Sequence, residues 1–157
     1  MLNNILLGFV IPWIFGLWLY TVNPKLVLTM APFSSVISFL VNHWGIYNGL
    51  WILTPILKIK TTSTIPMDIG LFPIISCFTC YFIQKSRFHP FLWILLFSTG
   101  QTILELTAYF YGKVLYSNDW NFAGTFLSYL IPGLITYYYF CLLRKKNVFD
   151  NEKWTRP

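Results

Sequence analysis

Glu105 is an acid within an otherwise uncharged, apolar segment of the chain. No other Asp, Glu, Lys or Arg occurs between Pro90 and Tyr111. An ionisable side chain inside a lipid bilayer is costly, so such a residue is by default a candidate for function. The rise of an α-helix puts Glu105 about 22 Å from Pro90, in the outer part of a membrane. We therefore expect Glu105 to bind a cationic or hydrogen-bonding ligand, or to accept a proton.

Small and polar residues recur along one predicted helix face around Glu105. They are Ser98, Gln101, Glu105, Ala108 and Gly112. Residues three and four positions apart share a face of a helix, so this face is predicted to point into a helix bundle. The large apolar residues between them are predicted to face lipid: Leu95, Leu96, Phe97, Leu104 and Phe110.

Polar residues from other segments are expected at the same membrane level. We predict that Gln101 supports Glu105 and that Glu105 faces His43 or Asn42. The candidate ligand-binding residues are Glu105, Gln101, His43, Asn42, Asp68 and Asn121. In the alternative interpretation Glu105 is protonated, or paired with His43, and only holds two helices together, because burial raises the pKa of a carboxyl group.

Other common chemistries lack their residues in this sequence. His43 and His89 fall on different segments, so no zinc site is expected. Cys77 and Cys80 have redox spacing, but no basic residue is near to lower a thiol pKa, so we interpret them as packing residues. Nucleotide-binding and hydrolase motifs do not occur. No cofactor or metal is expected, and no catalytic residue can be named.

The composition is that of an integral membrane protein. The 157 residues are 56% hydrophobic and only 10% charged, far below the roughly 25% charged content of soluble domains. The net charge of +6 comes from cations between apolar blocks, which indicates contact with anionic lipid headgroups and argues against nucleic-acid binding.

Runs without charge predict an all-α transmembrane bundle of about five spanning helices. Each run is judged against the roughly 20 apolar residues that a span needs. The predicted helices are 4–23, 31–53, 69–84, 90–111 and 121–143, in a single domain of residues 1–146. Residues 26–57 could instead cross twice, which would give six spans. Asn118 or Asp119 is expected near the N-cap of the last helix, and residues 147–157 form a short polar tail.

The cations predict the orientation, since Lys and Arg are enriched in cytoplasmic loops. Five spans put eight cations in the cytoplasm and three, Lys58, Lys60 and Lys113, outside; the eight are Lys25, Lys85, Arg87, Arg144, Lys145, Lys146, Lys153 and Arg156. An outside N-terminus and a cytoplasmic C-terminus follow. Six spans would give seven cations against four. Arg144, Lys145 and Lys146 are predicted to anchor the last helix to headgroups.

Several spaced residues also suggest a family. They are Asn42-x-x-Gly45-x-x-x-Gly49-x-Trp51, Pro66-x-x-x-Gly70-x-x-Pro73, Glu105 with Gly112, and Trp120-Asn121 with Tyr129. Over most of residues 32–139 the chain resembles a family of small, uncharacterised polytopic membrane proteins of Bacillus-type endospore-forming bacteria. The resemblance implies the bacterial plasma membrane and no known activity. It marks Asn42, Trp51, Glu105 and Asn121 as the first positions to test.

Three functions are compatible with these residues. The first is a non-enzymatic accessory, sensory or assembly subunit that recognises another membrane protein or a second copy of itself. The second is a small transporter or binder of a lipophilic or cationic molecule, with the Glu105 pocket opening outward. The third is an intramembrane enzyme acting on lipid, which needs Glu105 and His43 within hydrogen-bond reach. In all three the lipid bilayer is a partner, and the sequence favours the first.

Overall fold

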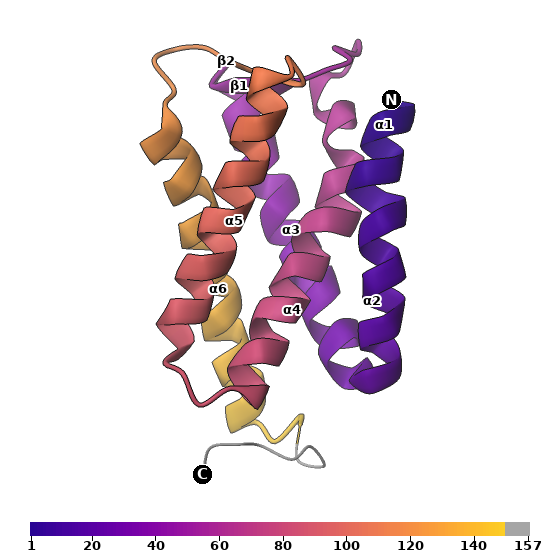
Figure 1. The fold of residues 1–157 in the computed structure, drawn as a ribbon, viewed down its shortest axis with the longest axis vertical. Helices are drawn as coiled ribbons and strands as arrows, with labels where there is room; N and C mark the ends of the chain where they lie inside the picture. The colour runs from indigo at the N-terminus through magenta and orange to yellow at the C-terminus, as the bar shows by residue number, and fades with distance from the viewer. Residues whose placement is uncertain (150–157) are drawn as a thin grey trace.

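The computed structural model describes residues 1–149 as a bundle of five long helices (Figure 1). Each helix is long and apolar enough to span a membrane. The spans are Leu2–Val22, Pro24–Tyr47 (α3), Met67–Lys85, Pro90–Phe110 (α5) and Phe122–Lys145 (α6). Leu2–Val22 consists of α1 (Leu2–Ile5), a π-helical turn η1 (Leu6–Val10) and α2 (Ile11–Val22), and Met67–Lys85 consists of a π-helical turn η3 (Met67–Leu71) and α4 (Phe72–Lys85). The predicted all-α bundle is confirmed, and the second region forms one span.

The second span begins earlier and ends earlier than predicted. Asn23 alone separates it from the first span, and its side chain accepts a hydrogen bond from the backbone N–H of Leu26 at 3.0 Å. Pro24 occupies the first helical position, where its missing N–H costs nothing. This cap starts α3 seven residues before the predicted Ala31. The prediction of helix through residue 53 was also wrong, because α3 ends at Tyr47.

Two short strands close one end of the bundle, which we call the strand end. β1 (Trp51–Leu53) and β2 (Val114–Tyr116) pair antiparallel, with Trp51 opposite Tyr116. A 3-10 turn, η2 (Lys60–Ser63), follows β1. The turn after β2 contains Asn118 and Asp119, both with positive φ. The prediction that Asn118 or Asp119 caps α6 was wrong. Asn121 is the N-cap, and its side chain accepts a hydrogen bond from the N–H of Gly124.

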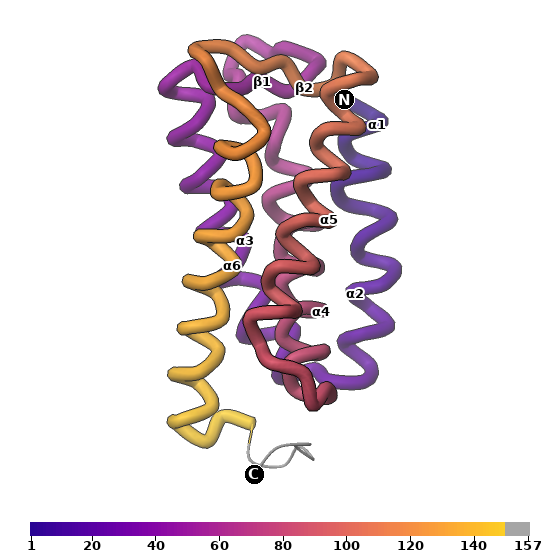
Figure 2. Tube along the Cα trace, turned by 60° about the vertical axis from the view of Figure 1, so that its left-hand side comes forward, coloured from indigo at the N-terminus to yellow at the C-terminus, as the bar shows by residue number. Residues whose placement is uncertain are grey.

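Helices α3, α4, α5 and α6 form a four-helix group, and the first span packs outside it. α3 packs most extensively on α4, α5 packs on α6, and α3 also contacts α6. The first span contacts α3, η3 and α4 (Figures 1 and 2). Close approach occurs at Gly70, where an added Cβ would lie 2.2 Å from the carbonyl oxygen of Gly8. Small residues therefore join the first span to η3.

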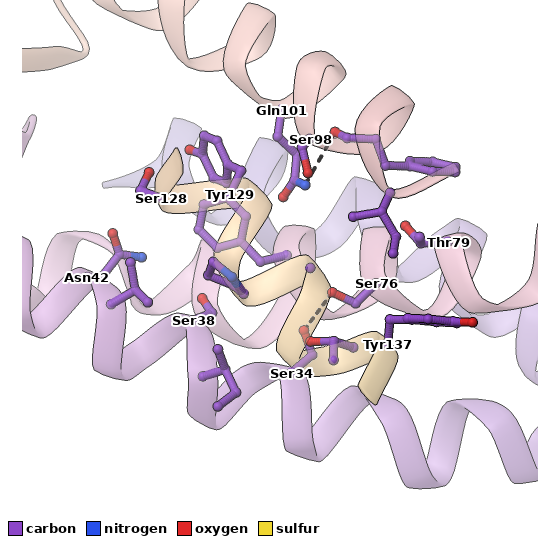
Figure 3. A pocket seen from close by; sticks show the side chains of 18 of the residues that line it. Ser34, Ser38, Asn42, Ser76, Thr79, Ser98, Gln101, Ser128, Tyr129 and Tyr137 are labelled. Atoms are coloured by element: carbon purple, nitrogen blue, oxygen red, sulfur yellow. Dashed lines mark hydrogen bonds between the residues drawn. The ribbon is translucent and has the colours of Figure 1, made fainter. Parts of the chain in front are cut away.

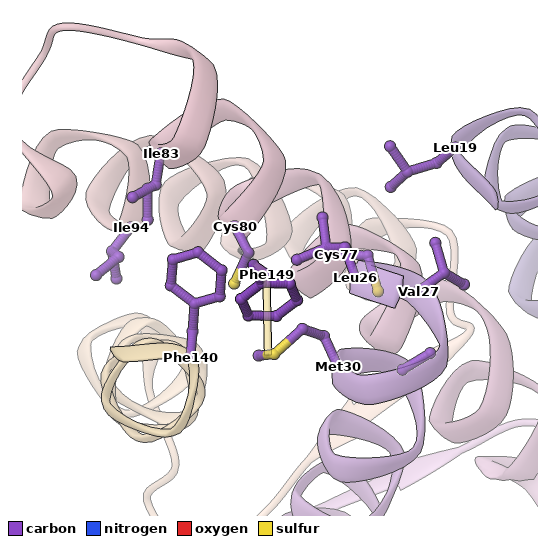
Figure 4. Packing of buried hydrophobic residues seen from close by; sticks show 11 residues of the cluster. Leu19, Leu26, Val27, Met30, Cys77, Cys80, Ile83, Ile94, Phe140 and Phe149 are labelled. Atoms are coloured by element: carbon purple, nitrogen blue, oxygen red, sulfur yellow. The ribbon is translucent and has the colours of Figure 1, made fainter. Parts of the chain in front are cut away.

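An apolar core fills the end of the bundle opposite the strands (Figure 4). It includes Leu19, Leu26, Met30, Cys77, Cys80, Ile94 and Phe140, all at most 1% exposed. Phe149 joins this core against Phe140, with ring centroids 5.5 Å apart. The segment predicted as a polar tail therefore begins with a turn that packs back on the bundle. Lys153 and Arg156 lie outside the described residues.

Candidate functional site

A polar cavity lies between the four helices, from the middle of the bundle toward the strand end (Figure 3). Each helix contributes serine hydroxyls, which line it together with two threonines: Ser34, Ser38, Ser76, Ser98, Ser128, Thr79 and Thr136. The hydroxyl of Ser34 donates to that of Ser76 at 2.7 Å. The space open to water is about 60 Å³, more than a single water molecule needs.

Glu105 borders this cavity and accepts hydrogen bonds from three hydroxyl groups. Tyr116 donates to Oε1 at 2.6 Å, and Thr125 lies 3.2 Å from the same oxygen. Tyr129 donates to Oε2. These partners come from β2 and α6, so the carboxyl group ties α5 to both. A carboxylate is a natural acceptor for several donors at once, and hydrogen bonds to a charged acceptor are the stronger kind.

Tyr116 connects Glu105 to the strand end. Its pKa is raised, first because its hydroxyl is partly buried and second because it donates to the Glu105 carboxyl group. Both causes favour the neutral phenol over the phenolate. Tyr116 therefore remains a hydrogen-bond donor to Glu105 at any physiological pH.

Asp68 is a second acid beside the cavity. It is 1% exposed, and its Oδ1 accepts from Ser38 at 2.5 Å and from Asn42 at 2.6 Å. Its Oδ2 is also buried, and the Thr64 hydroxyl interacts with the same carboxyl group. Asp68 lies in the π-helical turn η3, a type of helix irregularity that is frequent at functional sites.

Asn42 links Asp68 to the strand that covers the cavity. The indole N–H of Trp51 in β1 donates to Asn42 Oδ1 at 3.2 Å. Trp51 also packs over Gly45, where an added Cβ would meet its ring at 2.0 Å. A side chain at position 45 would therefore displace the tryptophan that lines the cavity at this end.

The backbone of α6 offers an additional oxygen. Pro132 lies inside this helix and has no N–H, so the carbonyl of Ser128 lacks its usual donor one turn later. Ser128 and Pro132 both line the cavity. Broken backbone hydrogen bonding of this kind supplies cation ligands in membrane carriers.

The structure brings together only part of the predicted ligand set. Glu105, Gln101 and Asn42 line the cavity, and Asp68 contacts Asn42. The Gln101 amide, however, donates to the carbonyl of Phe97 at 3.3 Å, so no bond from it to Glu105 supports the carboxyl group directly. Among the stripe residues, Ser98 is buried as expected, while Gly112 is exposed.

The other two predicted ligands lie elsewhere. His43 is exposed and stacks between Phe39 and Tyr47, so it neither pairs with Glu105 nor completes an acid–base site. It directly follows Asn42, and adjacent helical residues face different directions. Asn121 caps α6. Phe97, predicted to face lipid, lines the cavity instead.

The sequence predicted neither the serines of α3 that line the cavity nor the hydroxyl groups that donate to Glu105. The series Ser34, Ser38 and Asn42 has regular four-residue spacing, which could have predicted a polar face on α3. Nothing in the sequence pairs Tyr116 with Glu105, because their contact depends on the turn between α5 and β2.

The cavity has the chemistry of a cation site. Its lining within residues 1–149 contains hydroxyl, amide and carboxyl oxygens and no Lys, Arg or His. No cluster of three or more His, Cys, Asp or Glu side chains that could hold a metal ion occurs among these residues. Oxygen ligands with so few acids suit a monovalent cation better than a multivalent one.

Comparisons with protein families, with curated protein sequences and with solved structures give no match to this chain.

Proposed function

We propose that this multi-pass membrane protein binds a small monovalent cation, an alkali-metal or ammonium ion, in the cavity between α3, α4, α5 and α6, and acts as a small carrier. The observation that carries the proposal is a cavity lined by one acid, Glu105, and, within residues 1–149, by no Lys, Arg or His. The second acid, Asp68, is hydrogen-bonded to two lining residues, Ser38 and Asn42. An uncompensated carboxyl group inside an apolar bundle favours a cation beside it. Hydroxyl oxygens on all four helices would replace water around the ion.

The size of the cavity supports a small ion. About 60 Å³ of open space accommodates a cation with a partial water shell and excludes a drug-sized molecule. The carbonyl of Ser128, which lacks the N–H donor that Pro132 cannot supply, adds a backbone acceptor beside the hydroxyl oxygens.

The geometry favours this function over the two others that the sequence left open. An enzyme using Glu105 and His43 would need the two groups together, and His43 is on an exposed face. An accessory subunit would need no polar cavity, since exposed apolar helix faces are expected of any protein in lipid. The cavity is therefore the feature that separates the hypotheses.

We propose further that the strand end faces outward across a bacterial plasma membrane, with the C-terminus in the cytoplasm. Six Lys and Arg side chains within residues 1–149 lie at the end of the bundle opposite the strands, and this supports the orientation: Lys25, Lys85, Arg87, Arg144, Lys145 and Lys146. Lys58, Lys60 and Lys113 lie at the strand end. Cations concentrate on the cytoplasmic side of membrane proteins. There Arg144 and Lys145 at the end of α6 and Lys146 at its C-cap would contact anionic headgroups.

Binding of radioactive rubidium to the detergent-purified protein tests the site. Equilibrium dialysis should give saturable binding, and Glu105→Gln should weaken it at least tenfold, because the amide keeps the size of the side chain but removes its charge. Ser128→Ala removes one oxygen and leaves the Glu105 hydrogen bonds intact, so a smaller loss is expected. Glu152→Gln removes the same charge from the C-terminal segment and serves as the control.

Transport is tested by measuring rubidium uptake into liposomes that contain the protein. The loss of uptake should follow the loss of binding: largest for Glu105→Gln, smaller for Ser128→Ala and absent for Glu152→Gln. Absence of saturable rubidium binding, or equal binding by the folded Glu105→Gln protein, would overturn the proposed function. Binding without uptake would restrict the protein to a cation-binding role.

A further inference from the structure

A second pocket opens on the surface at the strand end, outside the inner cavity. It is an open depression of about 350 Å³ between the last turn of α5, β2 and the start of α6. Four aromatic side chains and one acid line it: Tyr109, Tyr116, Trp120, Phe122 and Asp119. None of the described residues that line it is Lys, Arg or His. We call it the aromatic vestibule.

The rings of the vestibule stand at different angles. Tyr109 stacks on Tyr116, with ring centroids 4.7 Å apart and an interplanar angle of 16°. Phe122 stands edge-on to Tyr109 at 78° and 6.4 Å. Aromatic rings gathered around one depression are the arrangement that binds alkylated ammonium groups, and the acid Asp119 adds a negative charge to this lining.

Hydrogen bonds behind the rings hold two of them in place. The Tyr116 hydroxyl donates to Glu105, and the indole N–H of Trp120 donates to the Thr125 hydroxyl at 2.9 Å. Trp120 also packs on Trp51, with ring centroids 4.8 Å apart. The polar atoms of these side chains are thus engaged on the bundle side, which leaves the rings themselves to line the depression.

The loop that carries Asp119 is fastened to the neighbouring turn. Ser117 Oγ donates to the carbonyl of Gly49 at 2.5 Å, and the Asn118 amide donates to the carbonyl of Asn48 at 3.0 Å. These bonds join the two turns at the strand end. A site whose residues are already fixed pays little to become ordered when a ligand binds.

We infer that the aromatic vestibule binds a methylated ammonium group, either of a free organic cation or of a choline headgroup. Aromatic residues at a membrane boundary are common without any ligand. Here they converge on one depression that also contains a carboxylate and no base. The inference uses residues outside the inner cavity, so it stands whether or not rubidium binds there.

Calorimetric titration with tetramethylammonium chloride tests this site on the purified full-length protein. The ion should bind saturably, and the uncharged isostere tert-butanol should not. Tyr109→Leu should weaken binding about two- to fivefold, because it removes one aromatic face from an exposed site, and Tyr109→Phe should keep the affinity. Asp119→Asn should weaken it by a similar factor. Tyr47→Leu, at another aromatic residue near the strand end, should have no effect.

The source of the group is distinguished in lipid nanodiscs. Weaker tetramethylammonium binding in phosphatidylcholine than in phosphatidylethanolamine nanodiscs would assign the vestibule to a choline headgroup, since both lipids have no net charge and only the first has a methylated ammonium group. Equal binding in both would assign it to a free cation. The inference is overturned if tert-butanol binds as well as the ion, or if Tyr109→Leu and Asp119→Asn both bind it like the unchanged protein.

Discussion

The two ends of the four-helix group use the same helices but fill the space between them differently. Away from the strands, Met30, Cys80 and Phe140 are at most 1% exposed and pack side chain against side chain. Toward the strands, serines and the acid Glu105 line a cavity. Lipid is as apolar as a leucine side chain, so helices in a membrane are held by close packing and hydrogen bonds. The apolar end supplies the packing, which allows the polar end to leave space open.

This difference predicts the largest loss of stability at the apolar end. Phe140→Ala should lower the free energy of unfolding by about 3–5 kcal/mol, because the cavity that it creates is surrounded by packed side chains. Leu142→Ala is the control, since Leu142 is 43% exposed on the same helix and should change stability little. Thermal unfolding in mild detergent measures both. Equal losses would mean that burial of Phe140 in the apolar core contributes no more than the exposed Leu142 side chain does.

A substitution at the contact between the first span and η3 should cost somewhat less. An added Cβ at Gly70 would meet backbone atoms of Gly8 and Phe9 at 2.2 and 2.7 Å. Backbone cannot rotate away, so we expect Gly70→Ala to cost about 1–3 kcal/mol, as overpacking does.

Gly100→Ala provides the matched control for that contact. Gly100 lies inside α5, and an added Cβ there has no neighbour within 4 Å. Alanine should be neutral or stabilise the helix by about 0.5–1 kcal/mol. A thermal shift of the same sign in both alanine variants would contradict the close contact at Gly70.

At the polar end, single hydroxyl groups should matter much less. Ser34→Ala removes the hydrogen bond to Ser76 and should cost about 0.6 kcal/mol, the average for such bonds between membrane helices. Ser35→Ala, on the neighbouring position outside the cavity, gives the background. A loss above about 2 kcal/mol for Ser34→Ala would show that hydrogen bonds, as well as packing, hold the bundle together.

The sequence predicted the parts of this comparison that depend on helix periodicity. Long uncharged runs predicted five helices, and the stripe through Ser98 and Glu105 predicted an inward polar face. The two strands were missed, because each has only three residues and lies beside a helix end. A charge-free run also could not show that α3 stops at Tyr47.

The partners of Glu105 were not predictable for a different reason. A helix pattern gives the face on which a residue lies but not the residue opposite. Tyr116 reaches Glu105 only because β2 folds back over α5, and Tyr129 reaches it because α6 packs beside α5. His43 was a plausible partner by membrane level alone, and its direction on α3 excludes it.

The smallest effect is expected from Tyr116 at alkaline pH. Its pKa is raised in the folded protein by burial and then by Glu105, whereas the unfolded chain releases this proton near pH 10, at roughly the ordinary tyrosine value. The stabilising contribution of the protonated hydroxyl is therefore complete below about pH 10 and is lost as pH rises toward the folded pKa. Unfolding temperatures on both sides of pH 10 should fall more for the unchanged protein than for Tyr116→Phe. Parallel curves for the two proteins would mean that the Tyr116 hydroxyl is solvated and does not hold the polar end closed over Glu105.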